Sequence, residues 1–553
     1  MKLSDERMAV RAIQILLLLT AWHRALLADE ENPMVQVQQG KLRGVRQETV
    51  WGKEYLAFYG IPFAKPPVGS LRFKAPQPPE PWTEVYDATM ERNECSQNHV
   101  VTKMHTGSED CLFLNVYTHK LADNTSSPRA VMVWIHGGAF KLGSGGAMMQ
   151  GPDYLMEEDV VVVTLQYRLG VFGFINLPAA GVSGNIGMKD QVMGLKWVQN
   201  NIASFGGDST RVTIFGESAG GASVHYHLLS PMSEGLFHGA IMQSGSALDP
   251  WAFKEPEEIR KATFELGNSF GCNQTGDTEL YDCLMKQSEE KLVGVLSFEM
   301  NFAPTIESAS KNDEDTFLEE RPWEIMNAGK SHNVRTIMGT NKYEAALFMS
   351  KVPVPSEDKL DEYIAHQLEK YQGSKSQDYK DELCRKIKTT YYGNNTVTNG
   401  TIDMLTDVMF LYGTDKTAKL HAAKKSEPVH YYMFTYDGKL AFHKLLHLHI
   451  SRSPTHADEL GNLFHTFFTP DLDKESSDVM MSRKLVRMWA NFAKDSDPTP
   501  TEDSLLNIKW PPYTTSDEVY LDMGKELELK RGLRKERMAL CEEVLGHTRK
   551  SKV

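Results

Sequence analysis

The feature that most constrains this chain is a tight turn between an apolar run and a helical segment. Residues 212–215, Val-Thr-Ile-Phe, are typical of a buried strand and pass directly into Gly216-Glu217-Ser218-Ala219-Gly220. In so tight a turn the residues two before and two after the serine must be tiny, and Gly216 and Gly220 meet that need. The turn lifts the Ser218 hydroxyl clear of the backbone, and the start of the next helix supplies N–H groups and a positive dipole end. A chance Gly-x-Ser-x-Gly in a loop would lack this flanking strand and helix.

The rest of the chain predicts an α/β fold with a mainly parallel central sheet. Continuous apolar runs indicate buried strands, and residues 188–202 carry apolar side chains at helical spacing. Strands that alternate with helical segments are typical of a parallel sheet with helices on both faces. The predicted strands are residues 131–135, 160–165, 212–215, 239–243, 334–338 and 429–434. The stretches 250–330 and 345–425 are mostly helical in composition, and we interpret them as long helical insertions over one core, so that residues 29–553 form a single domain.

The first 28 residues have the order of a signal peptide. Lys2, Arg7 and Arg11 precede an apolar run over residues 13–21, small residues follow, and residues 29–31 are acidic. A buried core helix and an uncleaved anchor are the alternatives. The run is too short to span a bilayer comfortably, and we expect no membrane span elsewhere.

Cysteines and sequons also favour export. Four of the six cysteines form two close couples, 95/111 and 272/283, and such short-range couples suit an oxidising compartment. Cys384 and Cys541 are left over, and the sequence does not say whether they pair. Glycosylation sequons occur at Asn124, Asn273, Asn394 and Asn399. We therefore expect a secreted or secretory-pathway glycoprotein.

The charge of the chain argues against one class of partner. Its 60 Lys and Arg residues are outnumbered by 73 Asp and Glu, which gives a formal net charge of −13. A chain of this sign repels phosphate backbones, so we expect no nucleic-acid partner.

A serine is a weak nucleophile and needs a base that is itself oriented by an acid. In folds with this turn the order along the chain is serine, acid, histidine. Glu344 follows the predicted strand 334–338, and His456 follows the strand 429–434, so these two are the candidates. His443 and His447 are four residues apart and would suit zinc, but no Glu or Cys completes a plausible ligand set. We expect no metal and no cofactor.

A second loop has the composition of an oxyanion hole. Residues 136–140, His-Gly-Gly-Ala-Phe, follow the predicted strand 131–135, and their small side chains would let backbone N–H groups approach a reacting carbonyl. The expected donors are Gly138, Ala139 and Ala219. An ordinary Gly-Gly turn is the alternative.

The sequence resembles the type-B carboxylesterase/cholinesterase family, and most of all its insect carboxylesterases, over nearly the whole predicted mature chain. The segments that carry the resemblance are 59–64, 66–69, 109–117, 167–170, 184–187, 205–208, 215–220 and 243–245. The resemblance implies the α/β-hydrolase fold, with Ser218, Glu344 and His456 as catalytic triad and Gly138, Ala139 and Ala219 as oxyanion hole.

The resemblance also implies structural pairs. These are the disulfides Cys95–Cys111 and Cys272–Cys283, and the buried ion pairs Arg72–Glu109 and Arg168–Asp190. Four positions depart from the family pattern: Gln166, Ala345, Pro454 and Asn462. Of these, Pro454 bears on the site, because it stiffens the loop that holds His456.

The predicted function is hydrolysis of neutral carboxylic esters through an acyl-enzyme, with a small-molecule ester as substrate, in detoxification or in odorant, pheromone or hormone ester degradation. A purely binding member of the family would have lost some of these residues. Juvenile hormone esterases, another alternative, typically carry Gln where Glu217 stands.

Overall fold

The computed structural model describes residues 32–546, except for 100–101, 124, 126, 273–275, 295–301, 308–315, 373–374 and 502. The predicted signal segment 1–28 and the sequons at Asn124 and Asn273 lie outside the described residues. Within the described residues, no helix combines the length and the apolar character needed to cross a bilayer.

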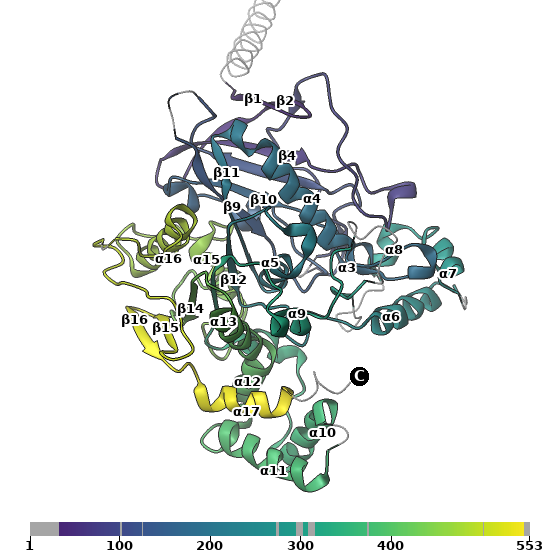
Figure 1. The fold of residues 1–553 in the computed structure, drawn as a ribbon, viewed down its shortest axis with the longest axis vertical. Helices are drawn as coiled ribbons and strands as arrows, with labels where there is room; N and C mark the ends of the chain where they lie inside the picture. The colour runs from purple at the N-terminus through teal and green to yellow at the C-terminus, as the bar shows by residue number, and fades with distance from the viewer. Residues whose placement is uncertain are drawn as a thin grey trace, which may run out of the picture.

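The centre of the molecule is an 11-stranded mixed sheet (Figure 1). The strands from β10 to β15 in the sheet order run parallel, and the strands at the two edges run antiparallel. From one edge the order is β16 (Leu527–Arg531), β15 (Val519–Met523), β14 (Val429–Phe434), β13 (Arg335–Asn341), β12 (Gly239–Gln243), β11 (Gly207–Glu217), β9 (Arg129–Ile135), β10 (Val161–Leu165), β8 (Phe113–Thr118), β4 (Glu54–Pro62) and β3 (Val45–Glu48). Five short strands form two smaller sheets: β1 (Met34–Val37), β2 (Gly40–Arg43), β5 (Tyr86–Asp87), β6 (Gln97–Asn98) and β7 (His105–Thr106).

The order of strands reverses next to β9. The chain leaves β9 for β10, then crosses back past β9 to form β11 on its other side. At such a reversal the loops that leave the two neighbouring strands part in opposite directions and open a crevice at the carboxyl ends. The loop after β9 and the turn after β11 therefore meet at one place.

Side chains of the central strands alternate between two cores. In β9, Val133 and Ile135 pack in one core, while Met132 and Trp134 pack in the other, and all four are fully buried. Helices α4 (Ile186–Asn201) and α5 (Ala219–Leu229) contribute to the first core, and α16 (Ser477–Asp495) covers the opposite face (Figure 1). The strands are apolar throughout because both of their faces are covered.

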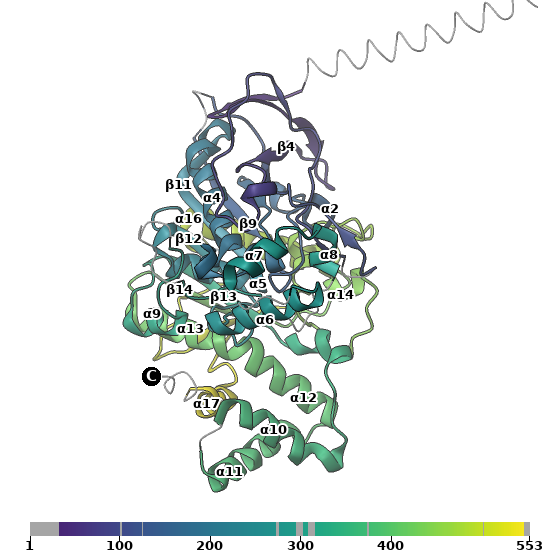
Figure 2. The same cartoon turned by 90° about the vertical axis from the view of Figure 1, so that its right-hand side faces the viewer.

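The remaining helices lie mostly in the long stretches between strands. They are α2 (Ala147–Gln150), α3 (Gly170–Phe174), α6 (Pro256–Ser269), α7 (Asp277–Leu284), α8 (Glu289–Gly294), α9 (Pro322–Ala328), α10 (Leu360–Gln372), α11 (Gln377–Ile387), α12 (Val397–Thr406), α13 (Tyr412–Lys424), α14 (Phe442–Leu445), α15 (Leu460–Leu463) and α17 (Lys535–Leu545). Two short π-helical turns, η9 (Lys388–Tyr392) and η10 (Asp407–Leu411), continue α11 and α12. Helices α10 and α11 project beyond the sheet in both views (Figures 1 and 2).

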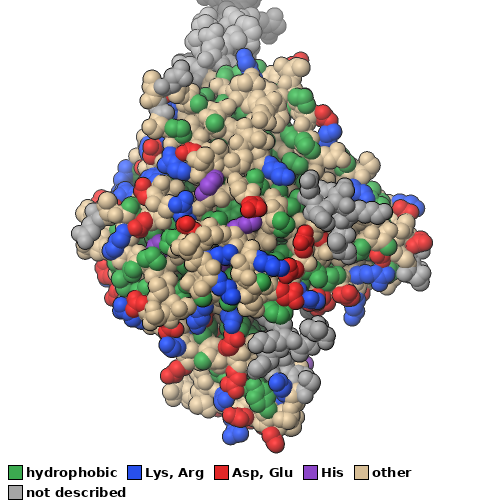
Figure 3. All heavy atoms as spheres, in the orientation of Figure 1, with side chains coloured by type: hydrophobic (Ala, Val, Ile, Leu, Met, Phe, Trp, Pro, Cys, Tyr) green, Lys and Arg blue, Asp and Glu red, His purple; other side chains and the backbone are tan. Residues whose placement is uncertain are grey.

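The predicted α/β class with a mainly parallel sheet is confirmed, as is the helical character of the insertions. Strands β12 and β14 have the predicted bounds, but β11 begins five residues before the predicted start, at Gly207. Residues 207–211 are mostly polar and their pairing with β9 is irregular, so an apolar pattern could not reveal them. On the face shown in Figure 3, acidic and basic side chains are interspersed.

Candidate active site

The turn after β11 holds Ser218 in a strained backbone conformation. Its φ of 58° and ψ of −122° lie outside the regions that ordinary residues prefer. A Cβ atom on Gly220 would lie 2.0 Å from the carbonyl oxygen of Ile135, and one on Gly216 would lie 2.6 Å from the same atom. The two glycines are thus needed because β9 passes directly beside the turn. The Ser218 side chain is left half-buried at the carboxyl end of the sheet.

The loops after β13 and β14 bring Glu344 and His456 together. Glu344 Oε2 lies 2.7 Å from His456 Nδ1, within hydrogen-bond distance. The other oxygen of Glu344 accepts hydrogen bonds from Ser244 Oγ and from the backbone N–H of Asn341, both at 2.6 Å. Because Glu344 is fully buried and each oxygen has a partner, its carboxylate has a single orientation.

The loop that carries His456 is held by hydrogen bonds to two other segments of the chain. Asp458 accepts hydrogen bonds from the backbone N–H of Thr455 at 2.6 Å and from His443 Nδ1 at 2.7 Å. Thr455 Oγ1 donates to the carbonyl of Tyr343 at 3.0 Å, next to Glu344. The Ser453–Pro454 peptide bond in this loop is cis. His443, considered above as a zinc ligand, is therefore bonded to Asp458, and no group of three metal-ligating side chains occurs in the described parts of the chain.

The second nitrogen of His456 faces the turn after β11. His456 Nε2 lies 3.2 Å from Glu217 Oε1, an ion-pair distance that lacks the angle of a hydrogen bond. Between the described side chains of Ser218 and His456 the structure has no hydrogen bond. Such contacts in ligand-free sites are often long and tighten when substrate binds.

Three buried carboxyl groups surround the His456 imidazole. Burial by itself would lower the pKa of His456, but the charges of Glu217 and Glu344 raise this pKa to about 9. Burial raises the pKa of Glu217 to about 8, against the opposing attraction of His456. The imidazole and the Glu217 carboxyl are in contact, and each favours the charged form of the other.

The third carboxyl group, Glu459, was not found from the sequence. It accepts hydrogen bonds from Gln243 Nε2 at 3.0 Å and from Asn341 Nδ2 at 2.5 Å. Gln243 also accepts a bond from the Trp489 indole at 3.0 Å. Burial raises the pKa of Glu459 to about 7. This network joins the ends of β12 and β13 to the His456 loop through groups that are far apart in the sequence.

The loop after β9 has a backbone conformation that suits a site where N–H groups donate hydrogen bonds. Gly138 has a φ of 111° and Ala139 a φ of 57°, both in the region that favours glycine. The carbonyl of Gly138 accepts from the N–H groups of Lys141 and Leu142, so the loop is a closed turn. Within the described chain, the N–H groups of Gly138, Ala139 and Ala219 have no hydrogen-bond acceptor. They are available to a ligand oxygen.

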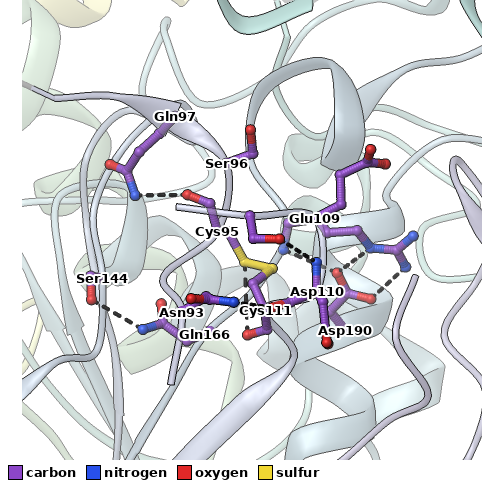
Figure 4. The surroundings of a disulfide bond; sticks show 12 residues. Asn93, Cys95, Ser96, Gln97, Glu109, Asp110, Cys111, Ser144, Gln166 and Asp190 are labelled. Carbon is purple, nitrogen blue, oxygen red and sulfur yellow. Dashed lines mark hydrogen bonds and ion pairs between the residues drawn. A yellow bond between two sulfur atoms is a disulfide. The ribbon is translucent and has the colours of Figure 1, made fainter. Parts of the chain in front are cut away.

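The Cys95–Cys111 loop braces this turn. Gln97, two residues after Cys95, donates from Nε2 to the Gly143 carbonyl at 2.8 Å and accepts from the Gly143 N–H at 2.7 Å. Figure 4 shows Gln97 also reaching back to the carbonyl of Cys95, at 3.0 Å. The disulfide and the candidate oxyanion loop are thus joined by one side chain.

Aromatic rings pack beside His456. Its ring centroid lies 4.7 Å from that of Phe410 and 5.3 Å from that of Phe348. Trp251 lies 6.0 Å from Phe410, and Phe140 lies 6.4 Å from Trp251. These rings form an apolar wall that no local sequence pattern predicted.

The pairs implied by the resemblance are present in the structure. Disulfides join Cys95 to Cys111 and Cys272 to Cys283, and Cys384 and Cys541 are free thiols. Arg72 pairs with Glu109, and the guanidinium of Arg168 makes two bonds to Asp190, at 2.6 and 2.8 Å. Of the described sequon residues, Asn394 is exposed and Asn399 is half-buried.

Comparison with known proteins shows the family of this chain. Residues 31–541 match the carboxylesterase family. The chain belongs to that family. It is 35% identical to esterase E4 of Myzus persicae over 527 residues, which cover 90% of each chain. It is 34% identical to the juvenile hormone esterase of Tribolium castaneum, covering 87% of this chain and 85% of that one.

A solved structure shows the same fold. The juvenile hormone esterase of Manduca sexta, with OTFP covalently attached, has a TM-score of 0.82 and 29% identity, and covers 93% of this chain and 99% of its own. As a member of the carboxylesterase family, this chain is a carboxylic ester hydrolase.

Proposed function

We propose that the carboxylesterase hydrolyses neutral carboxylic esters with Ser218 as nucleophile, His456 as general base and Glu344 as the acid that orients it. The observation that carries the proposal is the 2.7 Å bond between His456 Nδ1 and Glu344, at the end of the sheet where the strained turn presents Ser218. With Nδ1 held by the carboxylate, the proton of a neutral imidazole lies on Nδ1, and Nε2 is left to accept a proton.

The reaction follows from this tautomer. His456 Nε2 takes the proton of the Ser218 hydroxyl while the oxygen attacks the ester carbonyl, and the new oxyanion accepts hydrogen bonds from Gly138, Ala139 and Ala219. The imidazolium then gives its proton to the leaving alcohol, and an acyl-enzyme remains. Water repeats the cycle and releases the carboxylic acid. Each hydrogen-bond donor to the oxyanion is worth about 3 kcal/mol of transition-state stabilisation.

The neighbouring side chains favour a neutral substrate. The wall of Phe348, Phe410 and Trp251 offers apolar contact to an acyl or alcohol group. The loop between Cys95 and Cys111 contains no Trp, Tyr or Phe on which a quaternary ammonium group could stack. Glu217 stands at the position where juvenile hormone esterases typically have Gln, which favours a general carboxylesterase over that specific role.

The same proposal covers processing and place of action. We propose that residues 1–28 are removed as a secretion signal, that residues 29–553 form one domain, and that the enzyme is secreted or enters the secretory pathway and acts in detoxification or in odorant, pheromone or hormone ester degradation. The two disulfides support an oxidising compartment.

Labelling with a fluorophosphonate tests the site. The expected result is one modified residue, Ser218, found by peptide mass spectrometry, together with loss of ester hydrolysis and no labelling of Ser218→Ala. Ser244 and Ser246 are buried serines near the site and serve as internal controls. Modification of Ser244 or Ser246 with Ser218 untouched would refute the assignment.

A further inference from the structure

The C-terminal helix is tied to the candidate active site through one buried carboxylate. Helix α17 lies beside α10, α11 and α13, on the side of the molecule away from β1 and β2 (Figures 1 and 2). Just before it, Arg534 Nη1 donates to Asp407 Oδ1 at 2.7 Å. Arg537, within α17, also bonds to Asp407, and Tyr391 donates to it at 3.0 Å. Asp407 is fully buried, so its charge is balanced by these two guanidinium groups.

Arg534 has a second partner close to Glu344. Its Nη2 donates to the backbone carbonyl of Lys342 at 2.6 Å, two residues before Glu344 in the turn that follows β13. The backbone of Arg534 is left-handed, with φ of 45° and ψ of 40°, which a non-glycine residue rarely adopts. Such strain persists where the surroundings over-determine a conformation. Here both ends of a largely buried guanidinium are held, at Asp407 and at Lys342.

The turn that contains Asp407 also contacts the site. Asp407 opens the π-helical turn η10, and Phe410 in that turn packs against His456 with a centroid distance of 4.7 Å. The preceding residue, Thr406, accepts a hydrogen bond from the N–H of Ala345 at 3.1 Å. π-Helical turns are rare and occur frequently at functional sites. The turn that carries Glu344 and the turn that carries Phe410 are thus joined at two points, by Arg534 and by Thr406.

We propose that Arg534 is a positioning residue for the esterase reaction: by bridging Asp407 and the Lys342 carbonyl, it fixes the spacing between the acid that orients His456 and the ring that packs against His456. The inference rests on the proposed function of Glu344 and His456. A planar guanidinium can bond two acceptors in fixed directions, whereas a lysine ammonium on a flexible stem does not reproduce that geometry. Small displacements of a catalytic constellation cost turnover even when they arise away from the reacting atoms.

The chain offers a matched control. Arg534→Lys and Arg537→Lys are the same chemical change at two residues that contact the same carboxylate, but Arg537 bonds to the carbonyl of Asp403 and not to Lys342. Active sites are counted by stoichiometric labelling with an organophosphate, and kcat is expressed per labelled site. Loss of folded protein therefore does not affect the comparison of kcat between variants.

For Arg534→Lys we expect kcat per site to fall about tenfold with KM within about twofold of wild type, because the change alters geometry at the reacting groups and leaves the binding wall in place. For Arg537→Lys we expect a lower melting temperature but kcat within about twofold of wild type. Wild-type kcat per site in both variants would show that the pair serves stability alone, and equal losses in both would show that the bond to Lys342 has no effect of its own. Either result would overturn the proposal.

A pair of variants that leaves every charge unchanged tests the proposal if Arg534→Lys yields no folded protein. Thr406→Val keeps every charge and nearly the same volume but removes the acceptor for the Ala345 N–H, and Thr406→Ser keeps the hydroxyl. We expect about a fivefold loss of kcat per site in Thr406→Val and recovery in Thr406→Ser, since one buried hydrogen bond is worth about 1 kcal/mol. Unchanged turnover in Thr406→Val would show that the spacing between the turn of Glu344 and the turn of Phe410 does not affect turnover, and would overturn the proposal. Wild-type enzyme that neither labels at Ser218 nor turns over would refute the proposed function instead, which separates the two failures.

Discussion

Replacing Glu344 by Gln should place the proton of His456 on the wrong nitrogen. Glu344 Oε1 accepts two hydrogen bonds, from Ser244 Oγ and from the Asn341 N–H, each at 2.6 Å. The carbonyl oxygen of a glutamine must occupy that side, because its NH₂ group cannot accept either bond. The NH₂ group then faces His456 Nδ1, which must become the acceptor. The ring proton moves to Nε2, where it blocks the removal of the Ser218 proton.

The size of the effect has two parts. A charge-assisted hydrogen bond to the developing imidazolium is lost, worth about 1.5 to 3 kcal/mol, and the unfavourable tautomer adds a comparable cost. Together they correspond to a loss of about 10³- to 10⁴-fold in kcat, or about 4 to 5.4 kcal/mol. The substitution keeps the volume of the side chain, so the fold should remain intact.

The assay is hydrolysis of a nitrophenyl ester, with kcat expressed per folded molecule from circular dichroism and gel filtration. Glu307→Gln is the matched control, because Glu307 is also a buried carboxylate, paired with Lys189 at 2.6 Å, but is bonded to neither His456 nor Glu344. Glu307→Gln should lower stability and leave kcat unchanged. A Glu344→Gln enzyme within tenfold of wild type would refute the tautomer argument.

Three further predictions concern the same region. Glu217→Gln removes the carboxylate 3.2 Å from His456 Nε2 and so lowers the pKa of His456. Because the base must be neutral, the acid limb of the pH profile of kcat/KM should move to lower pH by about one to three units. An acid limb that stays in place or moves to higher pH would contradict this prediction. Gly220→Ala places a Cβ atom 2.0 Å from the Ile135 carbonyl oxygen and should lower the free energy of unfolding in urea by about 3 kcal/mol. An unchanged urea midpoint would mean that β9 shifts to make room for the Cβ atom at little cost. Nitrophenyl butyrate should have a higher kcat/KM than butyrylthiocholine, because the Cys95–Cys111 loop lacks an aromatic cation partner; the reverse order would place the enzyme with the cholinesterases.

Local sequence signals predicted the parts of the site that depend on backbone shape. Only glycine satisfies the steric limits at positions 216, 220 and 138, so these features can be recognised in the sequence. Glu344 and His456 were placed by chain order and strand ends, and the 2.7 Å bond between them is what that prediction requires. The assignment of their catalytic roles stays a prediction until turnover is measured.

The parts that were missed depend on packing between distant segments. Ser244 bonds to Glu344 and Phe410 packs against His456, each from a segment far away in the sequence, while Glu459 is near His456 in sequence but has its partners at the ends of β12 and β13. The polar start of β11 was missed because period and hydrophobicity do not mark a half-exposed strand end. His443 had the spacing of a metal ligand, but its actual partner, Asp458, is 15 residues away in a loop that folds back.

The order of strands in the sheet has a consequence for synthesis. Ser218, Glu344 and His456 follow β11, β13 and β14, so they leave the ribosome in that order, and the last of them emerges long after the first. Because Glu344 and His456 are 112 residues apart in the sequence, the bond between them can form only after the intervening chain has been made and its loops closed. On the proposed roles of Ser218 and His456, a nascent or prematurely terminated chain has the serine turn without its base, and we expect it not to hydrolyse esters until His456 has been made.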